Sequence, residues 1–366
     1  MENQLHDIKR IVVKVGTSTI TNSDGSLNKK AMLNLVGQIA KLKEKGYQVI
    51  LVSSGAVGTG NGKLGIVKNY SMAQKQASAA IGQITLMNEY VDLFSKYDLL
   101  VGQILLTKVD IANRKNNLNA RNTINQLLDF NAIPIINEND STVVDEIKVG
   151  DNDNLSGLVA IMSDADLLII LSDIDGVYTD NPSTNPNAKF LKVIEKVTPT
   201  VLSYAMGKGS EFSVGGMITK LECAKKVNKA GIDMIIANGQ KDNILLNILD
   251  NDYIGTLFLK SKDKIGAKKK FILLSSQSKG SITIDSGAAK ALENHASLLA
   301  VGILSNQGHF DFGDVIDIIF DKQVIARGLS NYNSSQVSEL KGKKLDETYD
   351  YETIVHKDNL VLVDKE

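Results

Sequence analysis

Short apolar runs alternate with amphipathic segments along the first two thirds of the chain. The runs have the length of strands, and the longer segments between them repeat apolar residues at helical spacing. The expected strands are residues 10–15, 48–52, 101–106, 133–136, 167–171 and 234–237, and the expected helices are residues 29–45, 71–96, 119–130, 155–162 and 219–229. Repeated strand–helix units favour an open, mostly parallel sheet covered by helices on both faces. We therefore expect an α/β fold.

The pattern changes after Phe258. Residues 260–270 are rich in lysine and polar residues, and short β-like runs follow at 281–284, 315–320 and 324–329. From residue 275 to the end there are 9 basic and 14 acidic residues, a net charge of −5 in a chain whose total is −1. We expect one domain over residues 1–262, a linker over 263–274 and a separate β-rich domain over 275–366.

The composition excludes several classes of protein. Apolar residues make up 43% and charged residues 23%, as in ordinary globular proteins. The single cysteine, Cys223, excludes a disulfide framework and a cysteine-based zinc site. The first ten residues are polar, and no stretch approaches the ~20 apolar residues of a membrane span. We expect a cytoplasmic protein with no membrane partner.

The sequence contains two clusters of acidic and amide residues. One follows an expected strand, and the other precedes an apolar run. Residues 137–140 read Asn-Glu-Asn-Asp, and residues 146–154 read Glu-Ile-Lys-Val-Gly-Asp-Asn-Asp-Asn. Capping of a helix that starts near Asn154 would account for one such residue but not for six. Because the carboxyl ends of parallel strands meet at one edge of a sheet, the clusters predict a polar site at that edge.

Three segments have features of a phosphate site. Lys14 lies inside an apolar strand with Gly16 just beyond it, which would put an ammonium beside backbone that a ligand can approach; an edge-strand lysine is the alternative. Residues 53–56, Ser-Ser-Gly-Ala, would present hydroxyls and amides to an anion, or form a simple turn. Residues 213–220 read as a glycine loop entering a helix, with Lys220 in the first turn, where a cation opposes the helix dipole.

Three other motif matches are discounted. Residues 60–65 fit G-x-G-x-x-G but begin eight residues past the strand that should directly precede them. The pair Gly62-Lys63 lacks both the first glycine and the Ser or Thr of a P-loop. Residues 311–313 spell Asp-Phe-Gly without the catalytic loop of protein kinases, so we expect a turn there.

Together these segments resemble the amino acid kinase family. The matches are I-V-V-K-V-G-T-S at 11–18, S-S-G-A at 53–56, L-N-A-R at 118–121, I-N-E-N-D at 136–140, E-I-K-V-G-D-N-D-N-L-S at 146–156 and G-G-M-x-T-K at 215–220. They span nearly the whole kinase-like part, and the tail is similar to the PUA domain, a small β-barrel known from RNA-modifying enzymes. The resemblance implies an enzyme that uses ATP and Mg²⁺ to phosphorylate the side-chain carboxylate of L-glutamate, in proline biosynthesis.

The resemblance also implies a role for each matching residue. Lys14 and Lys220 would hold the transferring phosphoryl group, and Asp153 would orient them. The glutamate-binding residues would be Ser54, Asn137, Asp140, Asp151 and Asn152. The ATP-binding residues would be Lys14, Gly16, Ser172, Asp173, Val214, Gly215, Gly216, Met217, Ile218, Thr219 and Lys220. Val214 stands where the family usually has threonine, and no residue is assigned to Mg²⁺, which ATP phosphates would hold.

Further partners and two alternatives follow from the same resemblance. It implies a homo-oligomer (dimer or tetramer), feedback inhibition by proline and a separate reductase for the labile acyl phosphate. One alternative is a family member that acts on aspartate, acetylglutamate, carbamate or UMP. The other is an RNA-binding protein with a vestigial kinase fold, although a tail of net charge −5 lacks the basic surface that nucleic acid requires.

Overall fold

The structure is a computed structural model and describes residues 5, 7–66, 71–142, 151–205, 214–261, 269, 272, 278–345 and 349–363. The chain divides into two compact units, one of Met1–Asp110 with Lys115–Asp263 and one of Ile111–Arg114 with Lys264–Glu366. Each unit has its own sheet and its own buried apolar cluster. The expected linker over 263–274 lies almost wholly outside the described residues, so its bounds stay a prediction.

The larger unit is built on an eight-stranded sheet. Its spatial order is β3 (Val101–Leu106), β4 (Ile133–Glu138), β2 (Gln48–Ser53), β1 (Arg10–Val15), β5 (Leu167–Ser172), β9 (Asp233–Asn238), β10 (Gly255–Phe258) and β8 (Val193–Ile194). The pairings from β3 to β9 are parallel, and β10 runs antiparallel to β9. The expected α/β fold and its strands are confirmed. Because β1 is paired on both sides, the edge-strand explanation of Lys14 is wrong.

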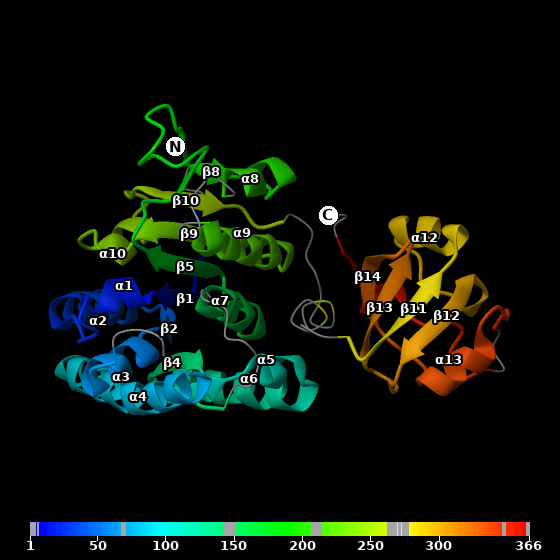
Figure 1. Cartoon of the computed structure of the whole chain (residues 1–366), viewed down its shortest axis with the longest axis horizontal. Coiled ribbons are helices and arrows are strands. Elements are labelled where there is room, and N and C mark those ends of the chain that lie inside the picture. Colours follow the sequence, from blue (N-terminus) through cyan, green and yellow to red (C-terminus); the bar gives the residue numbers. More distant parts are fainter. Residues whose placement is uncertain are drawn as a thin grey trace. The chain divides into compact units, whose positions relative to one another are not determined.

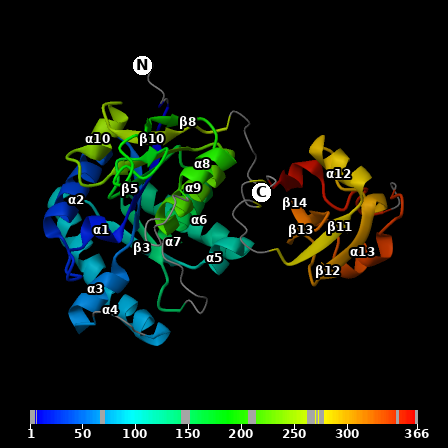
Figure 2. The ribbon, with the colours of Figure 1, turned by 45° about the horizontal axis from the view of Figure 1, so that its top comes forward.

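Helices cover both faces of this sheet, as Figures 1 and 2 show. Helices α2 (Lys29–Glu44), α4 (Met72–Phe94) and α10 (Ile244–Leu249) pack on one face, and α7 (Asp151–Met162) and α9 (Val214–Lys229) cover the other. Ile11, Val13 and Val15 of β1 belong to the core cluster beneath α2 and α4. Since side chains alternate along a strand, Lys14 points to the opposite face, toward α7 and α9.

Shorter elements complete the larger unit. They are α1 (Thr17–Ile20), α3 (Ala56–Leu64), the 3₁₀ turn η1 (Ser95–Tyr97), the first three residues of α5 (Lys108–Ala112), all but the first residue of α6 (Arg114–Asp129), β6 (Val177–Tyr178), β7 (Phe190–Leu191) and α8 (Pro199–Tyr204). Strands β6 and β7 form a separate two-stranded sheet. Among the described residues, none of the helices has the length and apolar character of a bilayer-spanning segment.

Two helices begin earlier than the sequence predicts. Helix α7 begins at Asp151 and not near Asn154, so the end of the second acid–amide cluster forms its first turn. Helix α9 begins at Val214, so the expected glycine loop is helical from that residue on, and Lys220 lies in the second turn, not the first. Glycine is a poor helix former, but propensity is a weak preference that tertiary packing overrides. Here α9 packs against α7, with Cys223 close to the backbone of Gly157.

Helix α3, which the sequence reading missed, crosses α4 at very short distance. A Cβ atom added to Gly60 would lie 1.8 Å from the carbonyl oxygen of Ser78, and one added to Gly82 would lie 1.8 Å from that of Ala56. These glycines are therefore required for backbone-to-backbone contact between the helices. The discounting of residues 60–65 as a nucleotide loop is confirmed, because the segment through Leu64 is helical.

The smaller unit has a five-stranded sheet in the order β12 (Ile303–Gly308), β11 (Gly280–Ile284), β13 (Val315–Phe320), β14 (Gln323–Leu329) and β15 (Leu360–Leu362). It also contains α12 (Ser286–Glu293), α13 (Ser334–Leu340) and the 3₁₀ turns η2 (Ala300–Gly302) and η3 (Lys357–Asn359), which were not predicted. Residues 311–313 form the expected turn, in which the Asp311 amide donates to the Asp314 carboxylate at 2.9 Å and Gly313 has φ 83°.

We predict that Gly82→Ala destabilises the protein, although the same change in an unobstructed helix would stabilise it by about 0.5–1 kcal/mol. The new Cβ would overlap the Ala56 carbonyl, so we expect the free energy of unfolding to fall by ~1–3 kcal/mol in denaturant titrations. Ala77→Ser, at an exposed position of the same helix, is the matched control and should change stability by less than ~0.5 kcal/mol. A Gly82→Ala protein as stable as wild type would contradict the close crossing.

Candidate active site

A pocket of about 510 Å³ opens at the carboxyl edge of the parallel strands β1, β2, β4 and β5. It is lined by Lys14, Gly16, Thr17, Ser18, Ser54, Gly55, Ala56, Val57, Gly58, Lys75, Asn137, Glu138, Asp140, Asn152, Asp153, Leu171, Ser172, Asp173, Gly216 and Lys220. The strand order reverses at β1, since β2 and then β4 lie on one side and β5 on the other. Ligands of open α/β sheets bind at such switch points. The structure thus brings Asn137, Glu138 and Asp140 of the first cluster and Asn152 and Asp153 of the second together with residues of the three phosphate-like segments, while residues 146–150 of the second cluster lie outside the described residues.

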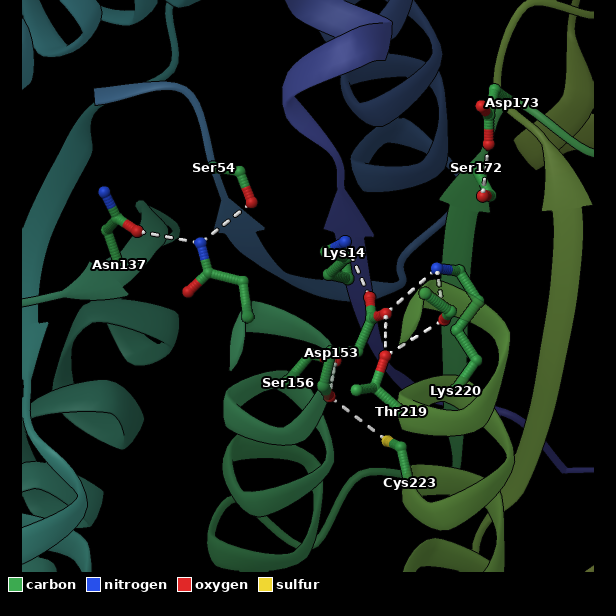
Figure 3. A network of polar contacts seen from close by, with 12 residues as sticks. Lys14, Ser54, Asn137, Asp153, Ser156, Ser172, Asp173, Thr219, Lys220 and Cys223 are labelled. Atoms are coloured by element: carbon green, nitrogen blue, oxygen red, sulfur yellow. Dashed lines mark hydrogen bonds and ion pairs between the residues drawn. The ribbon is translucent and has the colours of Figure 1, made fainter. Parts of the chain in front are cut away.

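Three buried charges form the centre of the pocket (Figure 3). The ammonium of Lys14 lies 2.6 Å from Oδ1 of Asp153, and that of Lys220 lies 3.0 Å from Oδ2 of the same carboxylate. The three residues come from β1, α9 and α7, and their exposed fractions are only 7%, 9% and 1%. Two positive charges share one negative charge, so the cluster keeps one positive charge in excess. A buried site of this kind favours an anion between the two ammonium groups.

The ionisation of the cluster follows from its burial and its charges. Burial lowers the pKa of Lys14, and the charge of Lys220 acts in the same direction, while Asp153 opposes both. Burial acts to raise the pKa of Asp153, but the two lysines outweigh it and hold that pKa below its usual value. Asp153 is therefore ionised at neutral pH, and its negative charge opposes the lowering of the Lys14 pKa.

Asp153 is held by its own neighbours as well as by the lysines (Figure 3). The hydroxyl of Thr219 donates to Oδ2 at 3.3 Å. The backbone carbonyl of Asp153 accepts from the Ser156 hydroxyl at 2.6 Å and from the Cys223 thiol at 3.1 Å. Lys220 in turn donates to the Gly216 carbonyl at 3.1 Å. These contacts fix the carboxylate and one of its lysines before any ligand arrives.

Amide side chains line the other end of the pocket. The Asn152 amide nitrogen donates to the Ser54 hydroxyl oxygen at 2.8 Å and to Oδ1 of Asn137 at 3.0 Å. Asn137 donates to Oε1 of Gln83 at 2.8 Å. Asp140 lines the same pocket and provides a carboxylate there. This end therefore combines hydroxyl, amide and carboxylate groups, which suit a ligand that carries both charges.

Most residues expected to bind a nucleotide also lie in the pocket. Gly16 is the N-cap of α1, and a Cβ on it would lie 3.6 Å from the Lys14 ammonium. Ser172 ends β5 and donates to Asp173 at 3.0 Å. Gly216 lines the pocket and Thr219 contacts Asp153, whereas Met217 and Ile218 are half-buried in α9 and are not among the lining residues. The side chains of Asp151, Val214 and Gly215 lie outside the described part of the structure.

Several lining residues were missed by the sequence reading. Thr17, Ser18 and Glu138 adjoin predicted site residues, so their neighbours were a usable signal. Lys75 lies near the start of α4, more than 20 residues from the nearest predicted site residue in the sequence. Nothing in the sequence around Lys75 pointed to a pocket, because only the packing of α4 brings this residue there.

Comparisons with known proteins agree with this arrangement. The model of the amino acid kinase family matches residues 9–238, and that of the PUA domain matches residues 280–351. The glutamate 5-kinase of Caldanaerobacter subterraneus subsp. tengcongensis is 44% identical over 97% of this chain and 98% of its own. That of Moorella thermoacetica is 42% identical over 98% of this chain and 97% of its own. The carbamate kinase from Giardia lamblia bound to AMP-PNP shares the fold, with a TM-score of 0.51 and 18% identity over 70% of this chain and 99% of that one.

We predict that the thiol of Cys223 is inert in the folded protein. Its side chain is buried beneath Asp153, and burial, together with that carboxylate, raises its pKa to about 12. A disulfide reagent such as DTNB at pH 8 should therefore react slowly with native protein and with one thiol per chain after unfolding in guanidinium, since the chain has a single cysteine. Rapid reaction of the native protein would show that the reagent reaches Cys223 between α7 and α9, and would contradict its burial.

Proposed function

Since the chain belongs to the amino acid kinase family and groups there with the glutamate 5-kinases, we propose that its pocket transfers the terminal phosphoryl group of ATP to the side-chain carboxylate of L-glutamate. The product is L-glutamyl 5-phosphate, formed in the first step of proline biosynthesis. The observation that supports the site assignment most directly is the pair of buried ammonium groups on Asp153, next to an end of the pocket made of amides and carboxylates.

The chemistry needs no general base. A glutamate side chain has a pKa near ~4.3, so the attacking carboxylate is already ionised at neutral pH. The obstacle is instead the repulsion between an anionic nucleophile and an anionic phosphoryl group. Lys14 and Lys220 can offset that charge as it is redistributed in the transition state. Asp153 has both carboxylate oxygens engaged by lysines and acts as an organiser of charge.

The two substrates would occupy the two ends of the pocket. Ser172, Asp173, Gly16, Gly216 and the other residues of the 214–220 segment would bind ATP. Ser54, Asp140 and Asn152 would bind glutamate, with Asn137 and Asp151 shaping the same end. Asp140 would pair with the α-ammonium, while hydroxyl and backbone donors face the carboxylates.

We assign Mg²⁺ to the phosphate oxygens of ATP. Among the described residues no group of three His, Cys, Asp or Glu side chains is arranged to hold a metal ion, and Asp153 is occupied by its lysines. Mg²⁺ is commonly held by substrate phosphates together with water and one or two carboxylates. When bound there it would neutralise phosphate charge, and the roles given above to the chain's own residues do not depend on its position.

Another member of the same family is the alternative. The likeness to the carbamate kinase concerns the fold alone, whereas the glutamate 5-kinases match over almost their whole length. The RNA-binding alternative rests on the PUA match over 280–351, which lies in the acidic tail.

Other properties implied by the resemblance remain proposals. We propose that proline competes with glutamate, because it shares the α-carboxylate and a cationic nitrogen but lacks the distal carboxylate that would attack ATP. We also propose a homo-oligomer (dimer or tetramer), a separate reductase that consumes the labile acyl phosphate, and a cytoplasmic location for these steps.

We predict that Lys14→Ala and Lys220→Ala each lower kcat by at least ~100-fold with a smaller effect on either KM, because their charge matters most in the transition state. The assay is ATP- and Mg²⁺-dependent formation of acyl hydroxamate, with glutamate, aspartate and acetylglutamate compared. Lys220→Arg should recover only part of the activity, since a planar guanidinium cannot place its charge at the position of the ammonium. Lys63→Ala, at an exposed position of α3, is the control. Near-normal turnover of either variant would remove that lysine from the phosphoryl site.

We predict that Asp140→Ala raises KM for glutamate by ~10-fold or more and leaves KM for ATP within ~2-fold, because it removes the partner of the α-ammonium. Proline inhibition should be relieved by glutamate in wild type and weakened in the variant. Asp92→Ala, exposed on α4, should change neither. Inhibition that high glutamate does not relieve, or that Asp140→Ala leaves intact, would place proline outside the glutamate pocket.

A further inference from the structure

A continuous chain of hydrogen bonds links helix α4 to the pocket. It runs from Gln83 through Asn137 and Asn152 to Ser54, with donor–acceptor distances of 2.8, 3.0 and 2.8 Å. The four residues come from α4, β4, α7 and the segment after β2. Asn137 is only 2% exposed, so its amide is satisfied by these neighbours and not by bulk water.

One backbone amide determines which group donates and which accepts along this whole chain of hydrogen bonds. The N–H of Glu138 donates to Oδ1 of Asn137 at 2.9 Å, and a backbone N–H can only donate. The atom that faces it must therefore be the oxygen of the Asn137 amide. Its nitrogen then points to Gln83, which must present its oxygen.

The same reasoning continues toward the pocket. Since Oδ1 of Asn137 is an acceptor, Asn152 must offer its amide nitrogen, and that nitrogen also donates to the hydroxyl oxygen of Ser54. The hydroxyl oxygen of Ser54 is thus used as an acceptor, while its own hydrogen is left for another group. The chain also leaves Oδ1 of Asn152 buried and without a partner among the described residues.

We propose that Gln83 is a positioning residue: its oxygen holds the Asn137 amide in the orientation that the Glu138 N–H sets, so that the hydrogen-bond chain stays formed and the Ser54 hydroxyl donates to a carboxylate of the substrate. A hydroxyl that can donate selects for an anionic oxygen, whereas a reversed chain would offer the pocket an acceptor that repels it. The inference rests on the proposed function, because it takes the substrate to be a carboxylate. It adds a residue of α4 that no motif identifies and that acts through Asn137.

The direction of the chain can be tested by exchanging donors and acceptors. Gln83→Met keeps the size of the side chain and removes the acceptor, so KM for glutamate should rise by ~5- to 10-fold, with kcat and KM for ATP within ~2-fold. Gln83→Lys places a donor against the donor of Asn137 and should raise KM for glutamate further. In the Asn137→Asp background the same Gln83→Lys change meets an acceptor and should instead lower KM for glutamate.

A double-mutant cycle of Gln83→Lys and Asn137→Asp therefore distinguishes a directional role from a merely structural one. Asn88→Leu, which removes an exposed amide from the same helix, is the matched control and should leave both KM values unchanged. Three outcomes would overturn the proposal: additive effects of the two changes in the cycle, an unchanged KM for glutamate in Gln83→Met, or a lower Tm in Gln83→Met accompanied by equal rises in KM for glutamate and for ATP. Failure of wild-type protein to form glutamyl hydroxamate would instead refute the proposed function.

Discussion

The pocket depends on one carboxylate placed between two lysines. Asp153 contacts Lys14 and Lys220 with different oxygens, and all three residues are almost fully buried. An ammonium in such a place is costly unless a charge of opposite sign lies beside it, and two ammonium groups that share one carboxylate remain only partly compensated. The arrangement is therefore stable enough to be formed in advance, yet it still favours an incoming anion. One carboxylate thus stabilises two buried ammonium groups without cancelling their charge, and we regard the remaining positive charge as the basis of phosphoryl binding here.

Much of this arrangement could be predicted from the sequence because parallel strands end at a common edge. Residues at the carboxyl ends of β1, β2 and β4 had to meet, so Lys14, Ser54 and Asn137 could be placed at one edge without coordinates, whereas Ser172 at the end of β5 was inferred from the resemblance. The role of Asp153 was inferred from a resemblance, and its contacts with both lysines now supply a physical reason for it.

The features that the sequence did not predict depend on packing between segments that are distant in sequence. Local signals placed the start of α9 too late, because glycines disfavour a helix and the contact with α7 does not appear in the local pattern. Helix α3 was missed because the three glycines within Ala56–Leu64 were read as part of a loop, whereas one of them, Gly60, allows the backbone contact with α4. Gln83 follows Gly82, the residue pressed against Ala56, so the same close crossing that hid α3 also brings Gln83 toward Asn137.

The central position of β1 has a consequence for how the protein is made. β1 is synthesised before the other strands of its sheet, but one of its two neighbours, β5, begins more than 150 residues later, and Lys220 follows later still. Sheets closed by such distant pairings fold slowly, and long chains often fold during synthesis. Asp153 is synthesised before β5, so the carboxylate that pairs with Lys14 is already available when β5 adds to β1 and the sheet buries Lys14. The excess positive charge arises only when α9 is added, so a nascent chain would pass through a neutral pair before it becomes able to attract an anion.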